Sequence, residues 1–375
     1  MKLLHINSYF STTPLYAQLY NRQVDQGLDI DVYVPIARQF PQERLAVSGV
    51  YSRCVRVYNQ VDRLFFHLKH YKILKDLLGQ YQFSEFDLVH AHSLFSNGWL
   101  AYQLKQRFGL AYLVAVRNTD INTFFGRMPW LRSMGIKILQ EANQIIFISK
   151  NTEQILYDQY IPEKLRAELQ GKSQVIPNGI DAFWHQQQGQ ARNLPLQQPL
   201  KIVSTGKIMG LKRFPQLAAM VQAYNDALGP AELHIVGPDW NPKIVAELQA
   251  HPLVHYHGPK AKEELSQLYR EMDLFALLSA PETFGLVYVE AMSQGLPLIY
   301  TKGQGFDSYF PNYQVGVSVD RNDTDGFIEA IQYIEAHYHQ LSQAGIVASR
   351  QFDWDQIQQQ YLNIYQAILK EDSLD

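Results

Sequence analysis

The chain has 375 residues, 46% of them hydrophobic and 18% charged, which excludes a disordered protein and favours two domains over one. The net charge of −3 and a sequence pI near 6.5 argue against nucleic-acid binding. The single cysteine, Cys54, excludes an internal disulfide and suits the reducing cytoplasm.

Charge is divided unevenly along the chain. Residues 1–181 contain 20 Lys and Arg against 15 Asp and Glu, whereas residues 182–375 contain 13 against 21. The basic half suits an anionic surface or acceptor, although chance scatter accounts for the difference about as well. Residues 1–7 are too short an apolar run for a signal peptide, and no run of about 18 apolar residues predicts a membrane span. We expect a cytoplasmic protein, at most peripheral at the inner face of the membrane.

Short apolar runs typical of buried strands alternate with amphipathic helical patterns. One series of strands is expected at residues 2–6, 30–34, 88–90, 112–116, 145–148 and 174–176, and a second at 201–204, 233–236, 254–256, 274–277 and 298–300. Helical patterns lie between them, for example at 61–78, 262–272 and 327–337. This alternation predicts an α/β protein with two doubly wound parallel sheets, each covered by helices on both faces.

The boundary between the two domains is expected at residues 177–199. This segment contains Asn178-Gly179, a glutamine run at 186–188, and Pro195 and Pro199, which together indicate a turn followed by a linker. We therefore predict domains at 1–180 and 181–354, followed by a last helix within 355–375.

A basic helix with an apolar stripe is expected at residues 64–75, preceded by Arg53, Arg56 and Arg63. Such a helix is able to rest on an anionic membrane and meet a lipid-linked acceptor. Covering a sheet is the commoner use of such a helix, and we favour that interpretation.

Two strands of the first domain end in polar residues. His90 and His92 lie on one face of the strand at 88–90. A zinc site needs further ligands, and the sequence indicates no third one nearby, so a structural pair is favoured. The strand at 112–116 is followed by Arg117, Asn118 and Asp120.

The first strand of the second domain ends in a basic glycine turn. Gly206 and Lys207 follow the strand, and Lys212 comes five residues later, at the sheet edge where doubly wound folds bind ligands. These lysines suit a diphosphate, although solvated surface lysines are the plainer alternative. Further loops at the same edge carry Gly237, Pro259 and the run from Gly303 to Gly305.

Residues 281–297 hold two acids eight positions apart, Glu282 and Glu290, around a turn at Gly285. A helix that begins there presents the N–H groups of Phe284, Gly285 and Leu286 and its positive dipole end, which suit a phosphate. Glu290 lies roughly one and a half turns into the helix. A buried strand, loop and helix with two chance acids is the alternative. The Asp-x-Asp triplets at 29–31, 323–325 and 353–355 lie outside such loops, which disfavours a metal-dependent transferase with a single-domain fold.

The run formed by Glu282, Phe284, Gly285, Glu290, Ala291, Met292, Gly295 and Pro297 resembles the donor-binding segment of family 4 of the retaining glycosyltransferases. That family has the GT-B fold, in which two Rossmann-like domains face a cleft. The resemblance implies that the first domain binds the acceptor, the second binds the nucleotide-sugar donor, and the last helix packs back on the first domain.

The resemblance also implies roles for individual residues. Glu290 is expected to accept hydrogen bonds from ribose hydroxyls and Glu282 to contact the transferred sugar. Lys207, Lys212 and the N–H groups at the start of the helix after Gly285 are expected to bind the diphosphate. The implied catalytic residues are Glu282, Lys207, Lys212 and Asp120. The implied donor-binding residues are Gly206, Lys207, Lys212, Gly237, Pro259, Glu282, Phe284, Gly285, Leu286 and Glu290.

The first domain departs from the family pattern. The family commonly reads His-Gly-x-Asp where this chain has Arg117, Asn118 and Asp120, and a usual glycine pair is replaced by the segment containing Ser11 and Thr12. The expected residues on the acceptor or sugar side are Ser11, Thr12, His92, Arg117, Asn118 and Asp120.

The resemblance implies transfer of a hexosyl or N-acetylhexosaminyl group, with retention, from a UDP- or GDP-sugar to a saccharide or lipid-linked acceptor. The setting it implies is the synthesis of a surface polysaccharide or glycolipid. It implies no cofactor and no divalent metal, since the nucleotide sugar is a substrate. The altered Arg117–Asn118 pair keeps open an alternative, a catalytically silent GT-B subunit that serves as a scaffold for an active partner.

Overall fold

The computed structural model describes residues 1–41, 50–192 and 198–372. Residues 193–197 of the predicted linker, including Pro195, and residues 373–375 of the predicted last helix lie outside the described residues. The chain divides into two compact units: unit 1 comprises Met1–Pro177 and Trp354–Asp375, and unit 2 comprises Asn178–Asp353.

The described part of unit 1 contains a seven-stranded parallel sheet in the order β3-β2-β1-β4-β5-β6-β7. All the strands that the sequence predicts for this half are present. They were predictable because buried parallel strands appear in the sequence as continuous apolar runs. The strands are β1 (Lys2–Ile6), β2 (Asp29–Ala37), β3 (Ser52–Tyr58), β4 (Leu88–Ala91), β5 (Tyr112–Val116), β6 (Gln144–Phe147) and β7 (Ser173–Val175).

Strand β3 corrects the sequence interpretation, which took Arg53 and Arg56 as the approach to a helix. Both arginines belong to this edge strand, whose first five residues are partly exposed. The helix predicted at 61–78 is also divided: a 3-10 turn covers Gln60–Leu64, and the α-helix is α2 (Phe66–Gln80).

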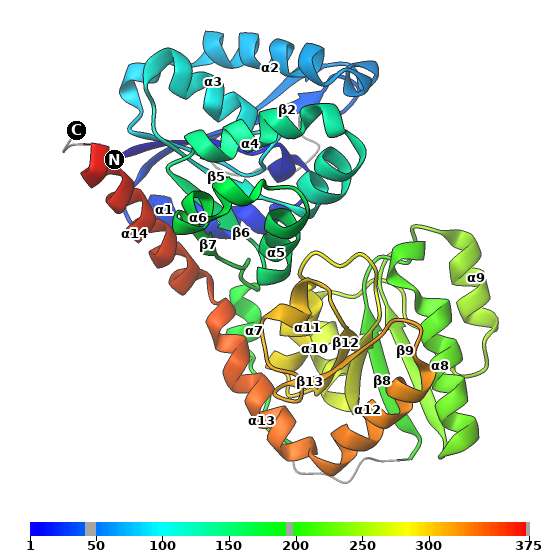
Figure 1. The fold of residues 1–375 in the computed structure, drawn as a ribbon. Coiled ribbons are helices and arrows are strands. Elements are labelled where there is room, and N and C mark those ends of the chain that lie inside the picture. Colours follow the sequence, from blue (N-terminus) through cyan, green and yellow to red (C-terminus); the bar gives the residue numbers. More distant parts are fainter. Residues whose placement is uncertain (42–49, 193–197, 373–375) are drawn as a thin grey trace. The chain divides into compact units, whose positions relative to one another are not determined.

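Helices cover both faces of the unit 1 sheet (Figure 1). One face packs against α2, α3 (Gly98–Phe108), α4 (Arg132–Glu141), α5 (Lys150–Gln159) and α6 (Glu163–Gly171). The other face packs against α1 (Ala17–Asp25) and α14 (Trp354–Asp372), the last helix of the chain. Helix α14 runs beside α1 in Figure 1 and buries Trp354, Ile357 and Tyr365 in the same core as Leu19 of α1.

The described part of unit 2 contains a six-stranded parallel sheet in the order β10-β9-β8-β11-β12-β13. Its strands are β8 (Leu200–Thr205), β9 (Ala231–Val236), β10 (Val254–Tyr256), β11 (Leu274–Leu277), β12 (Leu298–Thr301) and β13 (Gly316–Val319). Strand β13 is absent from the sequence prediction because it is a short edge strand that begins at a glycine. The strand order reverses between β8 and β11, and such a switch point opens a ligand-binding crevice at the carboxyl ends of the strands.

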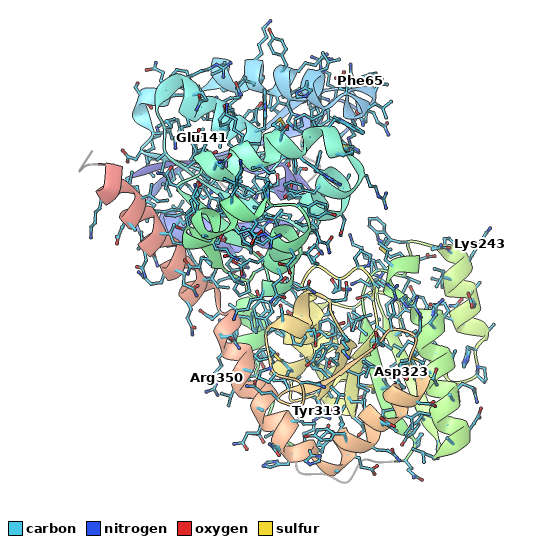
Figure 2. The ribbon with its side chains drawn as sticks, viewed as in Figure 1. Phe65, Glu141, Lys243, Tyr313, Asp323 and Arg350 are labelled. Carbon is cyan, nitrogen blue, oxygen red and sulfur yellow. The ribbon has the colours of Figure 1, made fainter. Side chains whose placement is uncertain are left out.

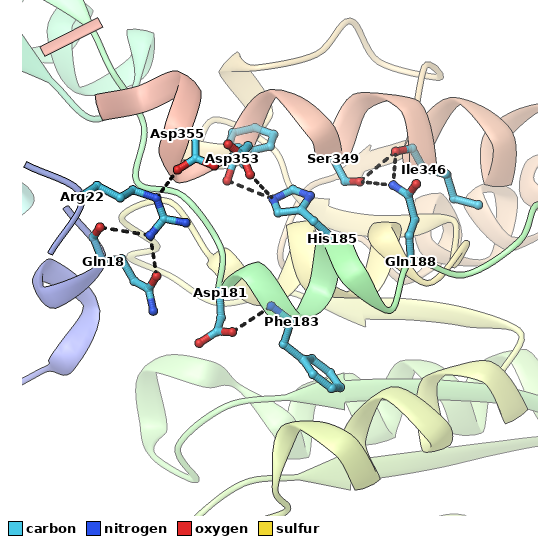
Figure 3. Close-up of polar contacts among 11 residues, drawn as sticks. Gln18, Arg22, Asp181, Phe183, His185, Gln188, Ile346, Ser349, Asp353 and Asp355 are labelled. Atoms are coloured by element: carbon cyan, nitrogen blue, oxygen red, sulfur yellow. Dashed lines mark hydrogen bonds and ion pairs between the residues drawn. The ribbon is translucent and has the colours of Figure 1, made fainter. Parts of the chain in front are cut away.

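The helices of unit 2 are α7 (Ala182–Gln186), α8 (Phe214–Ala227), α9 (Pro242–Ala250), α10 (Lys262–Glu271), α11 (Leu286–Ser293), α12 (Thr324–Ala336) and α13 (Tyr338–Ser349). Asp181 is the N-cap of helix α7, and its carboxylate accepts a hydrogen bond from the Phe183 N–H (Figure 3). Side chains at and just after α7 anchor it to the end of the unit: His185 Nε2 lies 3.9 Å from an Asp353 carboxylate oxygen, and Gln188 donates to the Ile346 carbonyl.

Among the described residues, none of the helices combines the length and apolar character needed to cross a bilayer.

Candidate active site

Three loops meet at the carboxyl edge of the unit 2 sheet. The Gly206 N–H donates to the Val236 carbonyl and the Gly237 N–H to the Gly258 carbonyl, each over 2.9 Å. A Cβ on Gly237 would lie 1.8 Å from the Gly206 carbonyl oxygen, so only glycine fits there. This contact brings together the loops after β8, β9 and β10, as the sequence predicts.

The Glu282 carboxylate forms the centre of a compact polar cluster. It accepts hydrogen bonds from Lys212 Nζ at 2.6 Å, from Ser279 Oγ at 2.7 Å and from the Thr283 N–H at 3.1 Å. The Glu282 side chain is 10% exposed and that of Lys212 21% exposed, so the contact is a partly desolvated ion pair. Sequence reasoning identified both charged residues but not their direct contact, nor the role of Ser279.

Gly285 turns the chain from this cluster into helix α11. Its φ of +82° lies in the left-handed region, and a Cβ would approach the Tyr288 ring to 2.5 Å. Gly285 supplies no side-chain cap, so the first N–H groups of α11 are left to other acceptors. The Gly305 N–H donates to the Glu282 carbonyl, and the Gln304 side chain accepts from the Glu282 N–H, so the loop after β12 lies against the same turn.

Glu290 projects from α11 beside the end of β8. Its carboxylate makes no hydrogen bond or ion pair within the described residues, and burial, with a smaller effect of Asp181, raises its pKa to about 7. The Tyr269 hydroxyl donates to Thr205 Oγ1 at 2.9 Å, and burial raises the pKa of Tyr269 well above its usual range, with Glu290 adding to the shift. A half-buried carboxylate that has a raised pKa and no partner is typical of a functional site.

The remaining predicted donor-site residues are distributed along this edge. Lys207 Nζ lies 4.1 Å from the centre of the Trp240 ring rather than in the Glu282 cluster. Trp240, which sequence reasoning missed, is 60% exposed after β9. Pro259 is exposed in the loop after β10, and Phe284 is buried against Phe306 and Phe352. Phe284 therefore contributes its side chain to the core of unit 2.

In unit 1, Asp120 organises the loops around it. Its buried carboxylate accepts hydrogen bonds from the N–H groups of Leu94, Phe95 and Arg117 at 2.9–3.1 Å. Burial raises its pKa to about 6 against the effect of these hydrogen bonds. The Arg117 guanidinium donates to the His92 carbonyl at 3.1 Å and is itself buried.

The other predicted acceptor-side groups also have partners within the protein. The Asn118 side chain accepts from Thr152 at 3.3 Å. Ser11 Oγ donates to the Ser8 carbonyl and Thr12 Oγ1 to the Tyr9 carbonyl, which closes a 3-10 turn after β1.

A third histidine, His5, joins His90 and His92, which corrects the inference that none lies nearby. His5 belongs to β1, where it pairs in register with His90. One ring nitrogen of each lies within 4.8 Å of the others, and His5 Nδ1 contacts His92 Nε2 at 3.1 Å. Burial holds the pKa of all three well below the usual range. The pairing of β1 with β4 places His5 beside His90, which is 85 positions away in the sequence.

Two family models match the chain in succession. Residues 15–182 match the family "Glycosyltransferase Family 4", and residues 187–348 match "Glycosyl transferases group 1". A D-inositol 3-phosphate glycosyltransferase of Mycolicibacterium smegmatis is 26% identical over 72% of this chain. That match spans 64% of the relative's own length. An N-acetyl-alpha-D-glucosaminyl L-malate synthase of Bacillus anthracis is 24% identical over 76% of each chain.

Solved structures share the fold over the whole chain. A sucrose-phosphate synthase from Thermosynechococcus elongatus superposes with a TM-score of 0.77 at 20% identity, covering 99% of this chain and all of its own. Anabaena HepE in complex with UDP-glucose has a TM-score of 0.64 at 17% identity and full coverage of both chains. Two doubly wound parallel-sheet units of this kind define a protein of the GT-B class. The chain belongs to the group 1 and family 4 glycosyltransferases, which confirms the resemblance seen in its sequence.

Proposed function

We propose that this glycosyltransferase takes its sugar from a nucleotide diphosphate donor bound at the carboxyl edge of unit 2, and transfers it with retention to a saccharide or lipid-linked acceptor bound by residues 1–180. The Lys212–Glu282 ion pair beside the uncapped start of α11 is the observation that supports this most strongly. A cation and free N–H groups at one turn are what a diphosphate requires.

Each charged group has a distinct task in this proposal. Lys212, now held by Glu282, neutralises charge on the departing diphosphate. The N–H groups at Gly285 and Leu286 bind its oxygens, and the partner-less Glu290 carboxylate accepts hydrogen bonds from the ribose hydroxyls. Glu282 keeps Lys212 in position and meets a hydroxyl of the transferred sugar.

Transfer with retention then needs no protein nucleophile. The acceptor oxygen bonds to the anomeric carbon on the face from which the diphosphate departs. The bond between the anomeric carbon and the diphosphate oxygen breaks, and a phosphate oxygen takes the proton of the acceptor hydroxyl. Lys212 and the helix N–H groups stabilise the leaving group, so a divalent metal is not required. The similarity to HepE, whose structure holds UDP-glucose, supports a UDP-sugar donor.

Nucleotide binding provides the test. Titration calorimetry with UDP and GDP, with and without EDTA, should give saturable binding that EDTA leaves unchanged, and Glu290→Gln should weaken it. A panel of nucleotide sugars should then reveal slow donor hydrolysis. Binding without turnover of any donor would favour the scaffold alternative, and the absence of any nucleotide binding would refute the donor site.

We also propose that unit 1 rests on an anionic membrane through the start of α2. Helix α2 covers the sheet with Ile73, Leu74 and Leu77, but the 3-10 turn before it and its first two turns expose apolar side chains to solvent. Five apolar side chains in this short segment are 47–79% exposed: Val61, Leu64, Phe65, Leu68 and Tyr71. Figure 2 shows Phe65 at the surface of the unit.

Basic residues surround this apolar surface, as an anionic bilayer requires. Arg63 precedes Leu64, and Lys75 follows on α2. Burial lowers the pKa of Lys69 to about 8, with Arg63 adding to the shift, and an anionic surface would favour its charged form.

Sedimentation with phosphatidylglycerol vesicles tests the membrane proposal. Binding should be strong at low salt, weaker at high salt, and reduced in a Leu64→Ser, Phe65→Ser double variant. Val347→Ser, which removes an apolar side chain of unit 2 about as exposed as Phe65, is the control. Equal sedimentation of the double variant and the wild type would contradict the proposal.

A further inference from the structure

Four side chains able to bind metal lie on one face of the unit 2 sheet, on the edge strand β10 and its neighbour β9. Glu232 and His234 alternate along β9, His255 lies on β10, and His257 follows it directly. The parallel register pairs His255 with His234, and residues two apart on a strand share a face. The proposed donor site uses none of these four side chains.

The spacing of three of these groups matches a transition-metal site. Glu232 Oε2 lies 3.4 Å from His234 Nε2 and 3.7 Å from His255 Nε2, and one ligand atom of each residue lies within 4.8 Å of the others. Zinc bonds of about 2.0–2.1 Å with tetrahedral angles place ligand atoms about 3.4 Å apart. Two of the three separations are close to this value, and the third is no longer than 4.8 Å.

His234 is oriented as a metal ligand would be. Its Nδ1 lies 3.0 Å from His257 Nε2, whereas its buried Nε2 makes no well-aligned hydrogen bond in the described chain and faces Glu232 Oε2 at 3.4 Å. We assign the proton to Nδ1, which leaves the lone pair of Nε2 directed toward Glu232. Ligating histidines typically use their second nitrogen in this way.

We propose that Glu232, His234 and His255 bind a divalent transition metal such as Zn²⁺, with His257 orienting His234 and solvent filling the fourth position. His255 is 48% exposed and Glu232 32% exposed, so the site is accessible to an ion from solution. The metal would join β9 to the edge strand β10 and thereby stabilise unit 2.

The cluster of His5, His90 and His92 is less suited to this role. All three residues are buried away from solvent, so an ion has no direct access to them. The hydroxyls of Tyr20 and Tyr365 already contact His92 and His90.

The experiment measures Zn²⁺ binding to the full chain after bound metal has been stripped with EDTA and the EDTA has been removed. Calorimetry should give one equivalent of bound Zn²⁺ in the wild type, and bound metal should raise the unfolding midpoint. His255→Ala and, independently, Glu232→Gln should abolish this binding, and His257→Gln should weaken it about 10–100-fold. His67→Ala, which removes an exposed histidine of unit 1, should change nothing.

Cobalt substitution reports on the geometry. Co²⁺ should give the intense visible absorption of a four-coordinate site in the wild type and not in His255→Ala. Circular dichroism establishes that each variant is folded. Zn²⁺ binding that persists undiminished in both His255→Ala and Glu232→Gln, or no specific binding in the wild type, would overturn the proposal.

Discussion

Replacing Glu290 by glutamine should make the protein more stable while weakening nucleotide binding. The carboxyl group has a folded-state pKa of about 7, raised by burial and then by Asp181, against an ordinary value of 4.5. A folded pKa above the unfolded one means that the ionised group destabilises the native state. This penalty is absent below about pH 4.5, grows as the pH rises, and is complete above pH 7.

The size of the effect follows from the shift. A pKa shift of about 2.5 units lowers the free energy of unfolding by at most about 3 kcal/mol at pH 8. At pH 5.5 the same two pKa values lower it by about 1.4 kcal/mol. Glutamine keeps the shape of the side chain but carries no charge. The advantage of Glu290→Gln over the wild type should therefore grow by about 2 kcal/mol between pH 5.5 and pH 8.

Urea unfolding measures this difference. Tryptophan fluorescence reports on both units, because unit 2 contains the buried Trp184 and unit 1 the buried Trp354. Transitions that differ between fluorescence and circular dichroism would show unfolding that is not two-state. Glu247→Gln, an exposed acid on α9, is the matched control and should show no such trend. A Glu290→Gln variant that is less stable at both pH values, or whose advantage does not change with pH, would refute the reasoning.

Three further substitutions test other contacts. Lys212→Met should lower the transfer rate about 10²–10³-fold, because it removes the cation that stabilises the departing diphosphate. Lys243→Met, on the surface in Figure 2, should leave the rate unchanged. Equal losses of rate in the two variants would contradict the assignment. Gly109→Ala, where a Cβ meets no other atom, should lower the stability of the protein by roughly 1–2 kcal/mol through its left-handed backbone alone. Gly285→Ala should lower it by clearly more, because the Cβ would also clash with Tyr288. Equal decreases of the two urea midpoints would exclude this steric effect. Asp120→Asn should destabilise unit 1 by about 1–3 kcal/mol because a buried backbone N–H loses its acceptor, and an unchanged thermal midpoint would count against that role.

Much of the fold was predictable from the sequence because its strands are buried on both faces. Such strands produce apolar runs that need no knowledge of their neighbours. The edge strand β3 was missed because its first five residues are partly exposed, so Arg53 and Arg56 interrupt its apolar signal. The edge strand β13 was missed because it is short and begins at a glycine. Their assignment depends on pairing with β2 and β12, which local patterns do not reveal.

The candidate site was predictable where residues follow parallel strands, since the carboxyl ends of those strands share one edge. That reasoning brought Lys212, Glu282 and Glu290 to the same region, while their chemical roles stay predictions. It did not reveal that Glu282 holds Lys212 directly, or that three backbone N–H groups surround Asp120. Side-chain contacts between distant loops depend on the packed structure.

Helix α14 imposes an order of events on biosynthesis. It supplies Trp354, Ile357 and Tyr365 to the core of unit 1, although it follows all of unit 2 in the chain. At roughly 5–20 residues per second, a ribosome needs on the order of ten to thirty seconds to translate unit 2 before this helix emerges. Unit 1 must wait in an incomplete state with its apolar surface beside α1 uncovered, so nascent chains are expected to need chaperone protection during that interval.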